Sequence, residues 1–312
     1  MNRLLILDDE ASTYREAILR RSLSEIEIVT AIDTDEAQQH VSSANIIFGK
    51  PALIASILSE ANRLQWVQST FAGIEPLCRP GLPKEYLLTG VKGLFGSLMS
   101  EYVFGYILAS ERSIIATDVN QQKKIWNRIK YRSLAELTIG IAGLGSIGRA
   151  IARTASHFDM RVLGLKRTPD KVDCVNQLYL PSELDVFLQQ LDYLVLVLPD
   201  TAESRNFITS NELNMMKESS ILINVGRGVT VNQRDLIAAL DKRRIAGAIL
   251  DVFEEEPLPP DNPLWSMENV VVTPHNSAYS FPEQVADIFC ENYLRFVDGL
   301  PLRYAVNFSR GY

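Results

Sequence analysis

Short apolar runs alternate with amphipathic segments along the first third of the chain. Strand-like runs are LLIL (4–7), EIEIV (25–29), NIIF (45–48), LQWVQ (64–68) and YLLTG (86–90). Between them, TYREAILRRSL (13–23) and ALIASILSE (52–60) carry apolar residues at helical spacing. This alternation predicts a small α/β domain over residues 1–97.

A second series follows the strongly apolar segment SEYVFGYILASER (100–112), which is expected to be a helix. Its near-continuous apolar runs are LTIGIAG (137–143), RVLGL (161–165), YLVLVL (193–198), SILINV (220–225), IAGAIL (245–250) and NVVVT (269–273). Strands buried on both faces have this composition, which is typical of a parallel sheet covered by helices. We therefore expect two doubly wound α/β domains, the second over residues 98–281. The helical tail from residue 282 can pack on either domain.

Composition narrows the class of protein and its setting. The chain has 312 residues, a net charge of −7 and three cysteines, none of them in a CxxC arrangement. The acidic balance disfavours a nucleic-acid surface, and the cysteines predict neither a disulfide framework nor a metal site. No apolar run approaches the roughly 20 residues that a membrane helix needs. We expect a cytoplasmic protein without a signal peptide or a membrane partner.

The clearest local motif is a glycine-rich turn in TIGIAGLGSIGRAIARTA (138–155). Gly143, Gly145 and Gly148 form G-x-G-x-x-G between a predicted strand and a predicted helix. Such glycines allow a tight turn, close approach of a pyrophosphate, and close packing of helix on strand. The motif in this context predicts a dinucleotide-binding domain, the alternative being a plain glycine turn.

The cofactor is expected to carry a 2′-phosphate. An NAD-binding unit has Asp or Glu after its second strand to accept from the ribose 2′-hydroxyl. Here that strand ends in Lys166, Arg167 and Thr168. Cations attract a phosphate and a carboxylate would repel it, so NADP is favoured over NAD, although NAD remains possible. The alternative is a solvated pair of cations.

Polar residues follow three later strands, where open α/β sheets bind their ligands. These are Arg227 in a glycine-flanked turn, Asp251 and Glu256 in LDVFEEEP, and His275. A guanidinium can bind a substrate carboxylate, and an imidazole can protonate a carbonyl oxygen after hydride transfer. A carboxylate beside the histidine favours the imidazolium. Together they predict reduction of a small 2-oxo acid, unless each is only structural.

Several motifs together resemble the D-isomer-specific 2-hydroxyacid dehydrogenases, most of all the glyoxylate/hydroxypyruvate reductase A branch. The family resemblance rests on GLGSIG (143–148), LPDTAES (198–204), NVGRGVTVN (224–232), LDVFEEEPLP (250–259), NPLW (262–265) and TPH (273–275). The branch is indicated by the chain length, KRT (166–168) in place of an acid, PLPPDNPLW (257–265) and the terminal RGY (310–312). The segment NSAYSFPE (276–283) departs from that branch, and Tyr279 and Phe281 are expected to present an apolar wall.

The resemblance implies a Rossmann dinucleotide-binding domain inserted into a flavodoxin-like substrate domain made of residues 1–97 plus 282–312. It places Arg227, Glu256 and His275 at the family's catalytic positions and Asp251 against the nicotinamide carboxamide. The loop STFAGIE (69–75) is similar to the family's substrate-carboxylate loop, which implicates Phe71, Ala72 and Gly73. Further cofactor-binding residues implied are Leu144, Ser146, Ile147, Leu198, Pro199, Thr201, Val225 and Gly226.

A homodimer with the helix 100–112 in its interface is also implied, although that helix can equally pack inside the protein. Two other functions remain open at this point. The protein can be a non-catalytic dinucleotide sensor, or it can be another dehydrogenase of the family that acts on phosphoglycerate, formate or phosphite. The sequence leaves the particular 2-oxo acid, the cofactor preference and the physiological direction undetermined.

Overall fold

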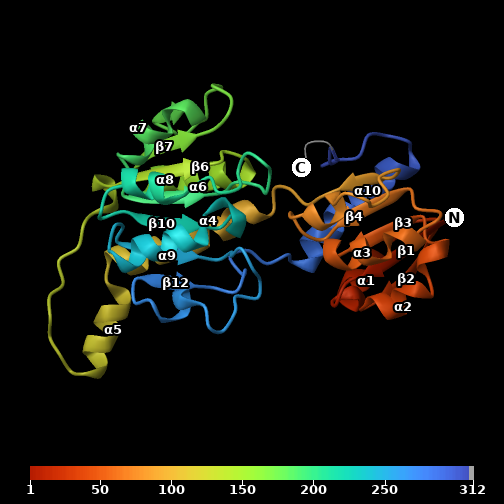
Figure 1. The fold of residues 1–312 in the computed structure, drawn as a ribbon. Coiled ribbons are helices and arrows are strands. Elements are labelled where there is room, and N and C mark those ends of the chain that lie inside the picture. The colour runs from red at the N-terminus through yellow and green to blue at the C-terminus, as the bar shows by residue number, and fades with distance from the viewer. Residues whose placement is uncertain (309–312) are drawn as a thin grey trace. The chain divides into compact units, whose positions relative to one another are not determined.

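The computed structural model describes residues 1–308, so the terminal RGY lies outside the described part. The chain divides into two compact units, Met1–Leu94 with Ser280–Tyr312, and Phe95–Tyr279. Figure 1 shows that each unit contains its own sheet with helices around it. Within residues 1–308, every helix is too short or too polar to traverse a lipid bilayer.

The first unit is built on a five-stranded parallel sheet in the order β2-β1-β3-β4-β5. Its strands are β1 (Asn2–Leu7), β2 (Ile26–Ala31), β3 (Ile46–Gly49), β4 (Trp66–Ser69) and β5 (Leu87–Thr89). Its helices are α1 (Ala11–Leu19), α2 (Thr34–Gln38), α3 (Pro51–Ile57) and α10 (Pro282–Val297). The strand order is the flavodoxin-like one, which confirms the predicted fold of this unit.

Side chains alternate between the two faces of this sheet, as the two-residue period of a strand requires. Leu5 and Leu7 of β1 belong to one core with residues of α2 and α3. On α10, Phe289 stacks on Trp66 of β4 and meets Phe48 of β3 edge-on. The C-terminal helix therefore covers the first sheet, which decides between the two placements that its sequence left open.

The second unit is built on a seven-stranded parallel sheet in the order β12-β11-β10-β9-β6-β7-β8. Its strands are β6 (Thr138–Ala142), β7 (Arg161–Leu165), β8 (Gln177–Tyr179), β9 (Tyr193–Leu196), β10 (Ile221–Asn224), β11 (Gly247–Leu250) and β12 (Val270–Val272). Its helices are α4 (Phe95–Glu111), α5 (Ile114–Gln122), α6 (Ser146–His157), α7 (Leu184–Leu188), α8 (Ser210–Met215) and α9 (Gln233–Asp241). The order reverses beside β6, which makes it the doubly wound Rossmann arrangement that the apolar runs predicted.

Both faces of the second sheet are covered, which explains its continuous apolar strands. One face packs on α4 and α6, through residues such as Val103 and Ile151. The other packs on α7, α8 and α9, through residues such as Phe187 and Leu236. Helix α4 thus does pack inside its unit along one side, whereas α5, which the sequence did not indicate, has no buried residue.

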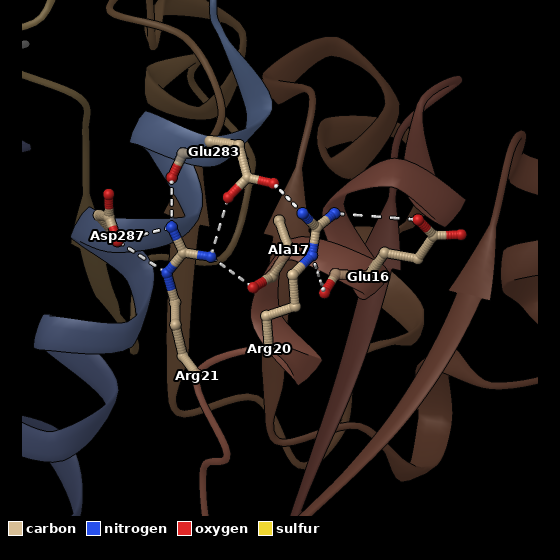
Figure 2. A network of polar contacts seen from close by, with 6 residues as sticks. All are labelled: Glu16, Ala17, Arg20, Arg21, Glu283 and Asp287. Carbon is tan, nitrogen blue, oxygen red and sulfur yellow. Dashed lines mark hydrogen bonds and ion pairs between the residues drawn. The ribbon is translucent and has the colours of Figure 1, made fainter.

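Charged side chains fasten α10 to the end of α1 (Figure 2). Arg21 donates from Nε to Asp287 at 2.7 Å, from one terminal nitrogen to the Glu283 side chain at 3.1 Å, and from the other to the Glu283 carbonyl at 3.0 Å. It also reaches the carbonyl oxygen of Ala17. The neighbouring Arg20 pairs with Glu283 from a far more open position, with 62% of its side chain exposed against 22% for Arg21.

We predict that Arg21→Ala lowers the free energy of unfolding by roughly 1–2 kcal/mol. The substitution removes several partly buried hydrogen bonds by which the guanidinium joins the end of α1 to Glu283 and Asp287 of α10. Arg20→Ala is the matched control and is expected to cost less than about 0.5 kcal/mol, as exposed pairs do. Urea unfolding of both variants measures the difference. If both variants lose the same free energy of unfolding, the bonds of Arg21 stabilise the protein no more than the exposed ion pair of Arg20 does.

Candidate functional site

The glycine turn joins β6 to α6 with three different geometries. Gly143 has φ of +99°, and a Cβ there would lie 2.5 Å from the carbonyl oxygen of Val197. A Cβ on Gly145 would meet nothing within 4 Å, whereas one on Gly148 would lie 2.0 Å from the Gly143 oxygen. The turn, the open approach and the tight helix packing are the three roles of glycines in a pyrophosphate-binding loop. The residues present therefore fit a dinucleotide, and the N-terminus of α6 is the end of the helix that would attract its phosphates.

The turns after β9 and β10 adjoin this loop. A Cβ on Gly226 would lie 2.8 Å from both the amide nitrogen and the carbonyl oxygen of Leu198, so the two turns pack directly against each other. Ser204 holds the first turn by accepting from the Thr201 amide at 2.9 Å and donating to the Pro199 carbonyl. These turns carry the remaining cofactor residues that the resemblance implied, including the buried Val225.

The cations after β7 are each paired with a carboxylate. Lys166 donates to Asp170 Oδ2 at 2.6 Å, and Arg167 donates to Glu203 at 3.1 Å. The Lys166 bond is the main reason why the pKa of Asp170 falls to about 2, and a bond from Thr168 adds to it. The sequence placed these cations but did not indicate their partners.

His275 and Glu256 are in direct contact, as the sequence predicted. His275 Nδ1 lies 2.8 Å from Glu256 Oε2, and Glu256 Oε1 accepts from the Phe253 amide at 2.9 Å. Both carboxylate oxygens are therefore committed, which fixes the plane of the carboxylate against the ring. Because Glu256 engages Nδ1, the ring nitrogen that remains for a ligand is Nε2.

The pair stabilises its charged form. The hydrogen bond to Glu256 raises the pKa of His275 above its ordinary value, against the opposing effect of burial. For Glu256, burial raises the pKa, but the bonds from His275 and Phe253 outweigh it and the net pKa lies below its usual range. The contact thus favours an imidazolium beside a carboxylate, which suits a histidine that donates a proton.

Arg227 stands in the turn after β10, where close packing holds the backbone. A Cβ on Gly228 would lie 1.9 Å from the carbonyl of Phe253, so only glycine fits next to Arg227. The Arg227 carbonyl accepts from Asn224 and Thr230, and its guanidinium donates to the Gly226 carbonyl. Its charge partly opposes the rise that Glu256 causes in the pKa of His275, and it adds to the fall in the pKa of Glu256, so the guanidinium lies within electrostatic reach of that pair.

Asp251 is fully buried and organises the segment around His275. Its Oδ1 accepts from Thr273 Oγ1 at 2.6 Å and from the Asn276 amide at 2.9 Å, and its Oδ2 accepts from the Ser277 amide at 3.0 Å. Its carbonyl accepts from the His275 amide at 3.0 Å. His275 itself is left-handed, with φ of +51°, and these bonds over-determine that uncommon conformation.

In the first unit, the loop after β4 is braced by its own side chains. Ser69 Oγ accepts from the Phe71 amide at 3.0 Å and donates to the Phe71 carbonyl at 2.7 Å. Thr70 donates to the buried Asp8 at 3.0 Å, and Lys50 lies 5.9 Å from the centre of the Phe71 ring. Burial is the main reason why the pKa of Asp8 rises to about 6.

Residues 104–277 match the profile of the D-isomer-specific 2-hydroxyacid dehydrogenase NAD-binding domain. The chain belongs to this family. Among curated members, a glyoxylate/hydroxypyruvate reductase A from Yersinia enterocolitica is 32% identical over 69% of this chain and 68% of its own. A glyoxylate reductase from Korarchaeum cryptofilum is 31% identical over 78% of this chain and 76% of its own.

Solved structures of dehydrogenases from the same family superpose over nearly the whole chain. A family protein from Aeromonas salmonicida is 41% identical, with a TM-score of 0.95 over 98% of this chain and 99% of that one. An NADPH-dependent glyoxylate/hydroxypyruvate reductase from Sinorhizobium meliloti, crystallised with NADP and sulfate, is 28% identical, with a TM-score of 0.89 over all of both chains.

Sequence reasoning about this dehydrogenase missed the residues that support the site. Tyr102 of α4 bonds to Thr273 at 2.6 Å, which extends the chain of bonds that ends on Asp251. A tyrosine in an apolar helix carries no signal of such a partner. Asp8 and Lys50 follow strands of the first sheet, so the rule that ligands bind at the carboxyl edge would have pointed to them.

We predict that Glu256→Gln lowers the pKa of His275, because the amide keeps a hydrogen bond but removes the negative charge. The pKa is measured from the imidazole proton shifts in NMR titrations. The chain has only three histidines, so the His275→Gln spectrum identifies the signal by its disappearance. His40 and His157 provide internal controls that should not move. An unchanged His275 pKa would contradict the electrostatic role of Glu256.

Proposed function

We propose that the protein reduces a small 2-oxo acid, glyoxylate or hydroxypyruvate, to the corresponding D-2-hydroxy acid with NADPH. The observation that carries this proposal is the hydrogen-bonded pair of His275 and Glu256, formed at the same sheet edge as the glycine turn. The names of the reductases from Yersinia enterocolitica and Korarchaeum cryptofilum support the substrate class. The complex of the Sinorhizobium meliloti reductase with NADP supports the cofactor.

Each proposed catalytic residue has one task. NADPH, when bound, supplies hydride to the substrate's carbonyl carbon. His275 donates a proton from Nε2 to the carbonyl oxygen, while Glu256 holds the ring through Nδ1 and stabilises the imidazolium before transfer. Arg227 binds the substrate's carboxylate with its planar fork and orients the carbonyl.

The remaining site residues are proposed as binding groups. Backbone amides of the loop Phe71, Ala72 and Gly73 would hold the substrate carboxylate. For the cofactor, the glycine turn would hold the pyrophosphate, and Lys166, Arg167 and Thr168 the 2′-phosphate. The turns at Leu198–Thr201 and Val225–Gly226 would line the nicotinamide half. Asp251 would meet the carboxamide, although its protein bonds also give it the task of fixing the His275 segment.

We propose that the protein forms a homodimer through residues 114–126, which comprise α5 and the segment after it and are called the arm below. Helix α5 and the segment after it expose Ile115, Val119, Ile125 and Trp126, with 94% of Trp126 accessible. A helix without a buried face gains little from its own chain, so a second copy would supply the packing. The base of the arm is fixed, because Arg132 donates to the buried Glu111. Unpaired Cys78, Cys174 and Cys290 agree with the proposed cytoplasmic location.

Removing the proton donor should separate chemistry from binding. We predict that His275→Ala lowers kcat for glyoxylate or hydroxypyruvate by roughly 100-fold or more, with little change in NADPH affinity. Initial rates against a panel of 2-oxo acids and fluorescence titration with NADPH measure the two effects. Wild-type turnover in the variant would contradict the acid role. A wild-type protein that binds NADPH but turns over no acid in the panel would favour the dinucleotide-sensing alternative.

Introducing charge on the arm should dissociate the dimer. We predict that Ile115→Lys converts the protein to monomers at micromolar concentration, because burying an unpaired ammonium is costly. Sedimentation equilibrium reports the mass. Val186→Lys, at an equally helical and half-exposed position on α7, is the control and should stay dimeric. A monomeric wild-type protein, or a dimeric Ile115→Lys variant, would contradict this interface.

A further inference from the structure

The segment after β7 contains an anion of its own within reach of the cofactor-selecting cations. Asp170 Oδ2 accepts from Lys166 Nζ at 2.6 Å and lies 4.0 Å from a guanidinium nitrogen of Arg149 on α6. The side chain of Thr168 also donates to this carboxylate. One carboxylate therefore gathers an ammonium, a hydroxyl and a nearby guanidinium, which is the set of groups that a phosphate monoester prefers.

A second cation–carboxylate pair lies close by, but its geometry is weaker. Arg167 meets Glu203 at 3.1 Å, with 61% and 74% of the two side chains exposed. Only 13% of the Lys166 side chain is exposed, although Asp170 itself is open to water. Exposed ion pairs are screened and mobile, whereas a lysine side chain that is mostly covered has fewer conformations open to it. Of the two carboxylates, Asp170 is thus the more persistent partner of the cations.

We propose that Asp170 competes with the cofactor's 2′-phosphate for Lys166 and Thr168, and thereby sets how strongly the protein prefers NADPH to NADH. The inference rests on the proposed function, because it takes these cations as the 2′-phosphate site. A phosphate at Lys166 must displace the carboxylate or share the ammonium with it, and both anions repel each other at that distance. NADH carries a hydroxyl at the same position and meets neither cost.

The competition predicts a change confined to ligands with a 2′-phosphate. Asp170→Asn keeps the size of the side chain and removes its charge. It should tighten NADPH and adenosine 2′,5′-bisphosphate by about two- to fivefold, the range of an exposed ion pair, and leave NADH and adenosine 5′-monophosphate unchanged. Calorimetric titration of all four ligands gives the dissociation constants without relying on turnover.

Asp173→Asn is the matched control, because it removes the same charge from an exposed position on the same segment. Its effect on the 2′-phosphorylated ligands should be clearly smaller. Equal effects of the two variants would replace local competition with a general charge effect and overturn the proposal. Equal changes for NADPH and NADH in Asp170→Asn, or no change for either, would also overturn it.

The wild-type protein separates this inference from the proposed function. If it binds adenosine 2′,5′-bisphosphate no more tightly than adenosine 5′-monophosphate, the 2′-phosphate site fails and the competition fails with it. If it prefers the bisphosphate and Lys166→Ala or Arg167→Ala removes that preference, the site stands. If the Asp170→Asn variant then shows the same preference for the bisphosphate as the wild-type protein, the competition by Asp170 is rejected while the 2′-phosphate site is retained.

Discussion

Parallel strand pairing is the constraint on which the arrangement of the second unit depends. In a parallel sheet all carboxyl ends lie on one edge, so every βα turn opens toward the same side. The sheet order β12-β11-β10-β9-β6-β7-β8 therefore places the glycine turn, the Arg227 turn, Asp251 and the His275 segment along one edge, although Gly143 and His275 are 132 positions apart in the sequence (275 − 143). No one segment needs to contain the site, since the register of the strands assembles it.

At that edge some backbone amides have no partner in the sheet, and the carboxylates of the buried Asp251 and the more exposed Glu256 accept hydrogen bonds from them. Asp251 receives two amides and a hydroxyl from the segment that follows β12, and Glu256 receives the amide of Phe253. An ionised carboxylate tolerates burial only when such donors surround it. The bonds that make the burial of Asp251 tolerable also hold the segment that contains the left-handed His275. One set of hydrogen bonds therefore both stabilises the buried acid and positions the imidazole.

The sequence was sufficient for the parts of the fold in which burial leaves a continuous apolar signal. Both sheets were predicted from such runs, whereas β8 (Gln177–Tyr179) is too short and α5 has no buried face, so neither produces a pattern. In the site, Glu256 and His275 were predicted because they are ionisable residues that follow predicted strands. The partners Tyr102, Asp170 and Glu203 could not be predicted, because sequence separation does not tell which way a side chain points.

The net negative charge of the chain affects how the proposed site can bind anionic ligands. A protein of net charge −7 that is proposed to bind a nucleotide and a 2-oxo acid, both anions, must collect its cations locally. The cations proposed for this task are Lys166, Arg167 and Arg227, and carboxylates of the chain lie beside or near each of them. On this proposal, the free energy of ligand binding is the difference between the ion pairs that the cations form with the ligand and the internal ion pairs that they give up. Because exposed pairs are worth little, small changes in the internal set shift selectivity without disturbing the fold.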